Sequence, residues 1–492
     1  MRGNWKKYLG VFVPMAVVIA APMILRDDET VGADAADLRL EVITPHNEAI
    51  RREFGDAFSK WYELQTGKSV YVNWRQPGGT SEIKRVLDSA FTTAEANGRE
   101  GIGLDVFMGG GVYDFSLQAR EGRFQPLDIF EKQAELFESG VIPTKQSGES
   151  YYPPNKDWLG VCLSSFGICY NLDSLERLGM EAPTGWSDLG DPSYQKGIAL
   201  ADPTKSGSVA KAFEMLVQQH IHQELKSGKS REKACEEGWR KGMNLIQRIG
   251  ANARYFTDGA SKVPHDVAQG DAVAGMCIDF YGRTYNESLK KADGRSRIEF
   301  VSPVGGTSIS VDPVAIFRGA PNEELAQEFV RFLYTKEGQM LWNARPGEEM
   351  GPRHRALRRL PIRRDLYEEP YLSQMIDAEV MPYETADEFM YDSSLTGKHF
   401  SPLRLIIRVM CIDSHQEMKS AWKALIEADF PKEASERFFD VSPIGYQDAL
   451  DKVRVTMKSG DNVSVMRMTN ELGRHFRENY QAAEKLAKGG VR

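Results

Sequence analysis

A short strand runs directly into a helix in the stretch LRLEVITPHNEAIRREFGDAF, residues 38–58. Apolar and polar residues alternate from Leu38 to Thr44, as they do in a strand with one buried face. Pro45 then suits the first turn of a helix, where no backbone N–H is required. Apolar residues recur at helical spacing up to Gly67, which predicts a stop: Ile50, Phe54, Phe58, Trp61 and Leu64. We therefore expect a strand over 38–44 and an amphipathic helix after it.

The same order of strand, turn and helix recurs along the chain. Ser69–Trp74 runs into Pro77-Gly78-Gly79-Thr80, Gly103–Met108 runs into Gly109-Gly110-Gly111, and a later strand ends before Ser206-Gly207-Ser208. This alternation predicts an α/β fold with a parallel sheet. Ligands bind beyond the carboxyl ends of such strands, where helix starts present free N–H groups that favour anions. We therefore expect a binder of a small polar or anionic solute.

The composition is that of a globular protein with two or three domains. The chain has 492 residues, of which 41% are hydrophobic and 27% charged, and a domain usually takes roughly 150 residues. A net charge of −8 argues against nucleic acid as a partner, because phosphate backbones bind basic surfaces. Six arginines between Arg353 and Arg364 form a local basic run. We expect this run to be a solvated face or a docking surface outside the ligand pocket.

The sequence contains neither a disulfide framework nor a catalytic motif. Its five cysteines stand at 162, 169, 235, 277 and 411 without a CxxC pair, and such sparse cysteines are usually buried apolar residues. One bridge among Cys162, Cys169 and Cys277 stays open. The GxSxG, HExxH, P-loop and zinc-ligand spacings are all missing. We therefore expect no enzyme activity, no cofactor and no bound metal.

The N-terminus has the charge pattern of an export signal or a membrane anchor. Arg2, Lys6 and Lys7 precede an uncharged run from Tyr8 to Leu25. A basic segment before such an apolar run predicts insertion into a membrane, with the rest of the chain outside. A cleaved signal and an uncleaved anchor both stay open. We expect the protein in the periplasm or on the outer face of the cytoplasmic membrane.

Six segments, taken in order, resemble the solute-binding proteins of bacterial ABC importers. They are ITPHNEAIRREFGDAF (43–58), LDVFMGG (104–110), GICYNLDSLERLGMEAPTGWSDL (167–189), ADPTKSGS (201–208), GDAVAGMCIDFY (270–281) and AQEFVRFLYTKEGQ (326–339). The chain is most similar to the branch with ferric-ion-binding, thiamine-binding and phosphorylated-sugar or phosphonate-binding proteins. The C-terminal part of the chain has no counterpart in this resemblance.

The resemblance implies a two-lobe, Venus-flytrap fold of the type II periplasmic-binding-protein class, with an extra and mainly helical C-terminal region. The implied division is a signal or anchor segment and linker over 1–37, a first lobe over 38–145, a second lobe over 146–283, a return to the first lobe over 284–349, and a helical extension over 350–492. In such proteins the ligand lies between the lobes, and closure traps it. The implied partners are a small-molecule ligand and an ABC permease in the membrane.

Two residues fall where the ferric-binding members hold iron. His46 matches their histidine ligand, and Tyr281 matches the second of their paired tyrosines, the first being replaced by Phe280. Their acidic ligand would fall near Gly110 and is missing, although Asp279 could substitute for it. Ferric iron favours phenolate and carboxylate oxygens, so these replacements argue against a free ferric ion.

Further candidate ligand-binding residues lie at the predicted helix starts and in the apolar segment WLGVCLSSFGICYN (158–171), which we expect to cross between the lobes. Glycine lets a backbone approach a ligand closely, consecutive N–H groups bind anions, and an arginine can bind an anion through two hydrogen bonds. The complete set of expected ligand-binding residues is His46, Gly79, Thr80, Gly109, Gly110, Ser164, Ser165, Ser206, Gly207, Ser208, Asp279, Tyr281 and Arg283.

The function that we expect is the substrate-binding component of an ABC importer for a small organic anion, such as an organophosphate or a phosphonate. One alternative keeps the fold and makes the chain a ferric-iron-binding transport protein. A second alternative is a membrane-anchored extracytoplasmic sensor or partner-binding protein, with residues 350–492 as its interaction module.

Overall fold

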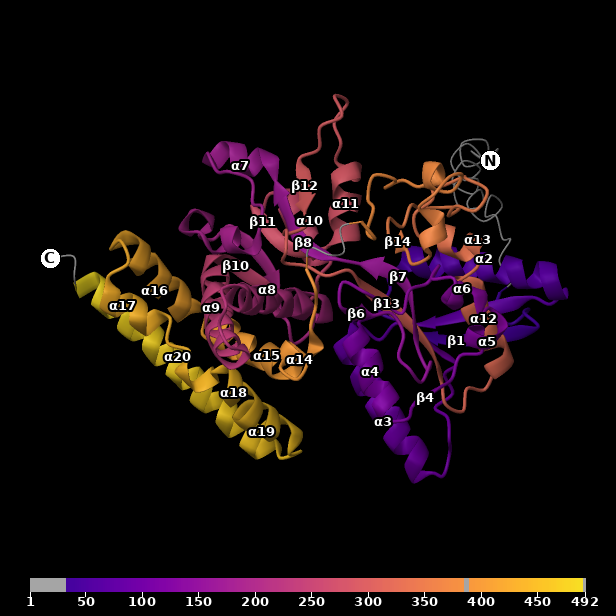
Figure 1. The fold of residues 1–492 in the computed structure, drawn as a ribbon, viewed down its shortest axis with the longest axis horizontal. Helices are drawn as coiled ribbons and strands as arrows, with labels where there is room; N and C mark the ends of the chain where they lie inside the picture. Colours follow the sequence, from indigo (N-terminus) through magenta and orange to yellow (C-terminus); the bar gives the residue numbers. More distant parts are fainter. Residues whose placement is uncertain (1–31, 385–388, 490–492) are drawn as a thin grey trace, which may run out of the picture.

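Two β-sheets organise the chain, and helices pack on each of them (Figure 1). The computed structural model describes residues 32–384 and 389–489. The larger sheet has the strand order β14-β7-β13-β3-β1-β2, with β4 paired to β13, and the smaller sheet has the order β10-β9-β11-β8-β12. We call the larger sheet with its helices the first lobe, and the smaller sheet with its helices the second lobe.

The first lobe begins with the parallel unit that the sequence predicts. β1 pairs in parallel with β2 and β3, which confirms the predicted parallel pairing of these strands, whereas β13 runs antiparallel to β3, β4 and β7 and makes the whole sheet mixed. The side chain of Asn47, and not Pro45, starts the first long helix by accepting a hydrogen bond from the N–H of Ile50, while Gly67 ends this helix in the left-handed conformation as predicted. The strands are β1 (Leu38–Ile43), β2 (Val70–Arg75), β3 (Val106–Met108), β4 (Phe124–Gln125), β7 (Leu159–Ser164), β13 (Ser310–Phe317) and β14 (Leu360–Pro361), and the helices are α2 (Glu48–Thr66), α3 (Thr80–Ala96), α4 (Val112–Arg120), α5 (Ile129–Lys132), α6 (Glu135–Glu138), α12 (Glu323–Leu333) and α13 (Lys336–Met340).

The second lobe has a mixed sheet. β9 pairs in parallel with β10 and β11, whereas β8 runs antiparallel to β11 and β12. The strands are β8 (Phe166–Asn171), β9 (Ile198–Ala201), β10 (Ala253–Thr257), β11 (Ala274–Ile278) and β12 (Ile298–Val301), and the helices are α7 (Leu172–Leu178), α8 (Gly207–Lys226), α9 (Arg231–Asn252), α10 (Lys262–Gln269) and α11 (Asp279–Ser288). A separate small hairpin joins β5 (Lys145–Gln146) to β6 (Glu149–Ser150).

The chain changes sheet at two places. β7 belongs to the larger sheet and β8 to the smaller one, so the first crossing is at Ser165. The return lies between Val301 and Ser310, because β12 is still in the smaller sheet and β13 is in the larger one. Both crossings come later in the chain than the domain limits expected at 145/146 and 283/284. β11 lies inside the smaller sheet, so the chain is still in the second lobe there.

Residues from 350 onward, which we call the extension, contact both lobes. Residues 350–384 contain no α-helix, in contrast to the expectation for this region, and β14 joins the larger sheet beside β7. The part from residue 389 onward packs on the second lobe and is mainly helical (Figure 1). Its helices are α14 (Ser393–Thr396), α15 (Phe400–Ile407), α16 (His415–Glu427), α17 (Lys432–Phe438), α18 (Tyr446–Asp448), α19 (Val455–Lys458) and α20 (Asn462–Gly489).

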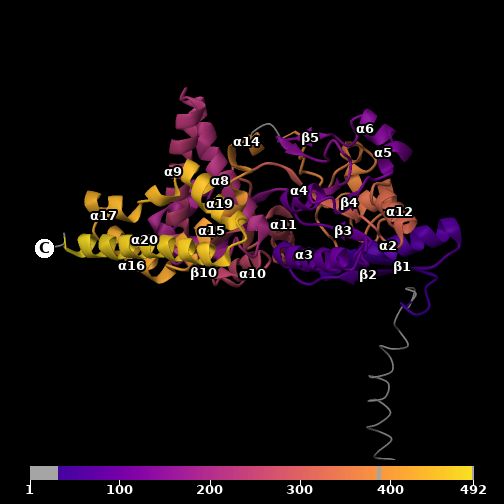
Figure 2. The same cartoon turned by 90° about the horizontal axis from the view of Figure 1, so that it is seen from below.

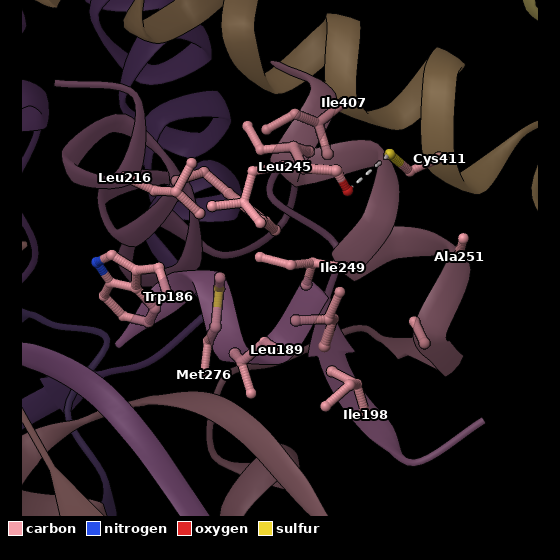
Figure 3. Close-up of a cluster of buried hydrophobic side chains, with 14 of the residues drawn as sticks. Trp186, Leu189, Ile198, Leu216, Leu245, Ile249, Ala251, Met276, Ile407 and Cys411 are labelled. Atoms are coloured by element: carbon pink, nitrogen blue, oxygen red, sulfur yellow. Dashed lines mark hydrogen bonds between the residues drawn. The ribbon is translucent and has the colours of Figure 1, made fainter. Parts of the chain in front are cut away.

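The extension shares the hydrophobic core of the second lobe. Figure 3 shows Ile407 and Cys411 of the extension beside Leu245 and Ile249 of α9, with Trp186 in the same cluster. Each such side chain contributes roughly 1.5–3 kcal/mol when it is fully buried. Figures 1 and 2 both place α16, α17 and α20 at the end of the molecule away from the first lobe. The part of the extension from residue 389 onward is therefore folded as part of the second lobe and not as a separate domain.

Two expectations from the sequence bear on the chain as a whole. All five cysteines are buried and free, so the bridge left open among Cys162, Cys169 and Cys277 is not formed. The predicted signal or anchor, Arg2 to Leu25, lies outside the described residues. Within the described ranges, no helix has the length and apolar character needed to cross a membrane.

Candidate functional site

A cavity of about 1240 Å³ lies between the two lobes. Helix starts from both lobes line it, together with part of the extension. From the first lobe come Pro45, His46, Gly79, Thr80, Gly110 and Gly111; from the second come Ser206, Gly207, Ser208, Phe280 and Tyr281; and from the extension come Arg359, Tyr391, Lys398, Phe400 and Arg454. The ends of strands in both sheets therefore meet at one site, as the α/β pattern predicts.

Three of the helices that start at this cavity have no side-chain cap. α3 starts after Gly79, α4 after Gly111 and α11 after Ile278, and no side chain accepts a hydrogen bond from the first turn of these helices. All three residues line the cavity. In α8, by contrast, Ser206 Oγ accepts a hydrogen bond from the N–H of Val209. Uncapped starts leave N–H groups and the positive end of the helix dipole available to an anion.

Gly109 and Gly110 allow two close contacts just before α4. Both glycines have positive φ angles, 86° and 117°, which L-residues with a side chain rarely adopt. A Cβ atom on Gly109 would lie 2.4 Å from the His46 ring, and a Cβ atom on Gly110 would lie 2.9 Å from the methyl group of Thr80. Gly110 lines the cavity and Gly109 lies behind it. Gly109 therefore serves the packing of His46.

His46 is fixed by a carboxylate from the first lobe. Its Nε2 lies 3.3 Å from Oδ2 of Asp312, a residue of β13, and its ring packs edge-on against Trp342. Burial lowers the pKa of His46, and the hydrogen bond to Asp312 only partly opposes this effect, so the ring is neutral at neutral pH. Asp312 thus holds His46 in place within the cavity wall.

Arg359 is the second partner of Asp312, and sequence reasoning missed it. Nη1 of Arg359 donates a hydrogen bond to Asp312 Oδ2 at 2.6 Å and another to Ser164 Oγ at 3.0 Å. Burial lowers the pKa of Arg359, but Asp312 together with Cys162 and Asp279 outweighs burial and keeps the pKa above its ordinary value. Arg359 belongs to the basic run that we expected to lie outside the pocket. That expectation is wrong for this residue, which lines the cavity and is 4% exposed.

Tyr281 lines the cavity, whereas two predicted neighbours do not. Burial raises the pKa of Tyr281, with the charge of Arg359 opposing, so its hydroxyl is neutral at neutral pH. Asp279 and Arg283 form an ion pair at 2.8 Å behind the cavity wall. Arg283 also contacts Asp377 at 3.4 Å and donates to the carbonyl of Arg358. The structure thus places Asp279 and Arg283 in a buried ionic network outside the cavity lining.

A second ionic cluster forms where the two lobes and the extension meet. Lys211 of α8 lies 3.0 Å from Glu149 of the β5–β6 hairpin, which precedes the crossing to the second lobe, and 3.0 Å from Glu214 of α8 itself. Its ammonium group also lies 3.3 Å from the centre of the Tyr391 ring. Burial lowers the pKa of Lys211, but the two carboxylates outweigh it and raise the pKa above its ordinary value. Because the two carboxylates already neutralise the charge of Lys211, we interpret this cluster as a structural contact that joins the parts of the molecule, and not as a binding site for the ligand.

The two lobes also touch beside the starts of α3 and α8. Ser81 Oγ of the first lobe donates to the carbonyl of Thr204 in the second at 3.0 Å. Arg404 of the extension donates to the carbonyls of Pro203 and Thr204 at 2.6 and 2.9 Å, and to Ser81 Oγ at 2.7 Å. One side chain of the extension therefore connects both lobes.

Most of the residues predicted for the site do line the cavity. His46, Gly79, Thr80, Gly110, Ser164, Ser206, Gly207, Ser208 and Tyr281 belong to its lining, and Gly109, Ser165, Asp279 and Arg283 do not. Asp312 and Arg359 are cavity residues that the prediction lacked. A signal for Asp312 was present in the sequence, because it is a single acidic residue within the apolar strand SVDPVAIF. Among the described residues, no group of three or more His, Cys, Asp or Glu side chains is arranged to hold a metal ion.

Comparisons of sequence show which proteins share parts of this chain. Residues 103–347 match the model of the family described as bacterial extracellular solute-binding protein. An uncharacterized protein of Haemophilus influenzae is 27% identical over 264 residues, which is 53% of this chain and 67% of that protein. The phosphoglycerate transport regulatory protein PgtC of Salmonella typhimurium is 24% identical over 183 residues, which is 37% of this chain and 40% of PgtC.

Comparisons of structure show the same fold. The periplasmic binding protein P5PA superposes with a TM-score of 0.50 at 18% identity, over 75% of this chain and 95% of that one. Iron-bound HitA of Pseudomonas aeruginosa does so with a TM-score of 0.50 at 16% identity, over 75% of this chain and 99% of that one. These proteins confirm the predicted type II periplasmic-binding-protein fold, and the family description implies a periplasmic location. The match over residues 103–347 places this part of the chain among the bacterial extracellular solute-binding proteins, which capture a solute for an ABC importer and are not enzymes.

Proposed function

We propose that this protein captures a small organic anion, of the organophosphate or phosphonate class, and delivers it to an ABC permease. The observation that carries the proposal is the convergence of three uncapped helix starts, those of α3, α4 and α11, on one cavity between the lobes. Such starts offer several N–H groups to the oxygens of one anion. The name of PgtC, a phosphoglycerate transport regulatory protein, agrees with this class of ligand.

The mechanism that we propose is binding between the lobes followed by closure. The anion would contact helix starts from both lobes, so it would favour the arrangement in which they are close together. A ligand shifts such an equilibrium only by its differential affinity for the two arrangements. The predicted division of the chain into two moving lobes belongs to this proposal, and so do those predicted ligand-binding residues that line the cavity. So does attachment of the N-terminal segment to the membrane.

A ferric ion is a poorer match for the cavity. The resemblance to ferric-binding proteins includes paired tyrosines, but this chain has Phe280 in place of the first. The guanidinium carbon of Arg359 lies 4.2 Å from the centre of the Phe280 ring, and the Arg359 charge acts on the neighbouring Tyr281. A permanent cation beside the remaining phenol opposes the binding of Fe³⁺, which prefers anionic oxygen ligands.

The first test is a thermal-shift assay of the purified full chain. The panel contains inorganic phosphate, a phosphoglycerate, a phosphorylated sugar, a phosphonate, thiamine and ferric citrate. A ligand at about 100 times its Kd adds roughly 2.7 kcal/mol of stability, which raises the melting temperature by a few degrees. We expect a shift with a phosphorylated compound or a phosphonate. A shift with ferric citrate alone would instead establish the iron-binding alternative.

A pair of substitutions tests the helix starts directly. Gly111 has φ and ψ angles of −113° and 155°, which any residue can adopt, and an added Cβ would have 4.0 Å to the nearest side-chain atom. Gly111→Asn should cap α4 with a neutral group, and Gly111→Asp should cap it with a charged one. Both variants should bind the anion more weakly, Gly111→Asp the more so because of charge repulsion. Unchanged affinity in both would remove the start of α4 from the site.

A second candidate function is an extracytoplasmic sensor with the same ligand site. PgtC is named as a regulatory protein, and the extension of this chain contacts both lobes, as a reporter of lobe position would have to do. This candidate predicts that ligand changes the binding of a membrane partner that is not a permease. A pull-down from membranes with and without ligand distinguishes the two functions.

A further inference from the structure

Arg359 is a buried cation that the extension, and not either lobe's own strand–helix units, brings to the cavity. It lies just before β14, which adds the extension to the edge of the larger sheet. Within the described residues, all the hydrogen bonds that its guanidinium group donates come from Nη1, and their acceptors are Asp312, Ser164 and the Cys162 sulfur. These three acceptors fix the position of the guanidinium group.

The opposite edge of the same guanidinium has no partner. Nε of Arg359 is buried without a hydrogen bond, and within residues 32–384 and 389–489 no acceptor is found for Nη2. Nε–H and Nη2–H form the parallel fork that matches two oxygens of a carboxylate or phosphate. A buried donor without a partner costs free energy, so this edge marks a place where an acceptor from a ligand would be stabilising.

Phe280 fixes the plane of this fork. The guanidinium carbon lies 4.2 Å from the centre of the Phe280 ring, within the range of a cation–π contact. Phe280, Ser164 and Asp312 all line the cavity together with Arg359. The fork is therefore held from the face by the ring and from the far edge by Asp312, which is the preorganisation that tight binding requires.

Arg283 provides a natural comparison. It is a half-buried arginine that also pairs with a carboxylate, that of Asp279, at 2.8 Å. Its Nε likewise makes no hydrogen bond, but that atom faces the Asp377 carboxylate at 3.4 Å, and Nη2 donates to the carbonyl of Arg358. Arg283 does not line the cavity. The two arginines thus carry the same charge and each pairs with a carboxylate, but only Arg359 lines the cavity.

We propose that Arg359 binds the anionic group of the solute through Nε and Nη2, so that the extension completes the ligand site. This inference rests on the proposed function and adds to it a specific cation. Asp312 acts as a positioning residue, because it orients the guanidinium from the edge that the ligand does not use. The helix starts of α3, α4 and α11 then surround the remaining oxygens of the same group.

The test compares Arg359→Lys with Arg283→Lys in the full chain. Lysine keeps the charge and loses the fork. Isothermal titration with inorganic phosphate and with a phosphoglycerate gives Kd for each protein. We expect Arg359→Lys to raise Kd about tenfold or more, which corresponds to roughly 1.4 kcal/mol, and Arg283→Lys to leave Kd within about twofold of wild type. Equal Kd values for wild type and Arg359→Lys would overturn the assignment of Arg359 while leaving the anion site in place.

A second variant covers the case in which Arg359→Lys fails to fold. The double substitution Arg359→Gln, Asp312→Asn removes both charges of the pair and leaves no buried ion unpaired. It should retain a cooperative thermal transition and lose phosphate-dependent stabilisation. Wild-type protein that binds neither probe would overturn the proposed phosphate-class function together with this assignment, whereas a double variant that binds like wild type would overturn only the assignment.

Discussion

Replacing Arg404 with alanine should loosen the contact between the lobes. Arg404 lies on α15 of the extension and donates three hydrogen bonds. Two of the acceptors, the carbonyls of Pro203 and Thr204, belong to the second lobe on which α15 packs. The third acceptor, Ser81 Oγ at 2.7 Å, belongs to α3 of the first lobe. Only this third bond has to break when the lobes separate.

The size of the effect depends on the single Arg404 hydrogen bond that reaches the first lobe. A hydrogen bond from a charged donor contributes about 1.5–3 kcal/mol, and Arg404 is only half-buried, which favours the lower end. Arg404→Ala should therefore shift the equilibrium toward separated lobes by roughly tenfold. The substitution also removes the two hydrogen bonds to the second lobe, so it should lower the global stability and therefore the melting temperature.

Small-angle X-ray scattering and ligand dissociation rates provide the assay. We expect a larger radius of gyration without ligand, and faster dissociation with it, for Arg404→Ala. Arg408→Ala is the matched control, because Arg408 is one turn further along and exposed, and pairs with Asp413 at 3.5 Å on its own segment. Ser81→Ala should reproduce the looser contact with a smaller loss of melting temperature. Identical scattering and rates for Arg404→Ala and Arg408→Ala would refute the reasoning.

Three further predictions concern the cavity wall. Burial raises the pKa of Asp114 above its ordinary value of 3.8, so the folded state binds the proton of Asp114 more tightly than the unfolded state does. Wild type therefore loses stability as the pH rises from the unfolded pKa through the folded pKa of this residue. Asp114→Asn should melt at a higher temperature than wild type near neutral pH, and this difference should vanish in a melting series toward pH 4. Lys211→Met leaves two buried carboxylates without their cation and should lower the free energy of unfolding, measured in urea, by about 3–5 kcal/mol; a loss below about 1 kcal/mol would contradict the buried ionic cluster. Gly148→Ala places a Cβ 1.9 Å from the carbonyl oxygen of Tyr391 and should speed proteolysis of the extension, whereas Gly228→Ala, also at positive φ but in open space, should not.

The first lobe could be predicted from the sequence because its signals are local. The strand and helix of residues 38–67 follow from alternation, helical spacing and a terminal glycine, and the structure differs only in using Asn47 as the cap. The order of strands could not be predicted in the same way. β13 pairs with β3 and β7, about 200 and 150 residues earlier in the chain, and pairing over such distances leaves no local pattern.

The candidate site shows the same limit. The rule that anions bind at helix starts led to Thr80, Gly110 and Ser206, which do line the cavity. Arg359 could not be found by that rule, because it precedes a two-residue strand and stands among five other arginines. Its burial depends on Asp312, whose partner in the folded chain is not visible from the sequence. Conversely, Arg283 follows a strand as the rule requires, but Asp279 and Asp377 hold it behind the wall.

Part of the pocket is encoded downstream of the family match, which ends at residue 347. Arg359, Tyr391, Lys398 and Phe400 all face the cavity from that downstream segment. Mutation there can alter the chemistry of the pocket while the paired strands β1, β2 and β3 and the helices on them stay intact. Selectivity in this protein can therefore evolve by substitution of cavity-facing residues downstream of the family match, provided that the side chains that pair with β7 and that pack in the core of the second lobe are kept.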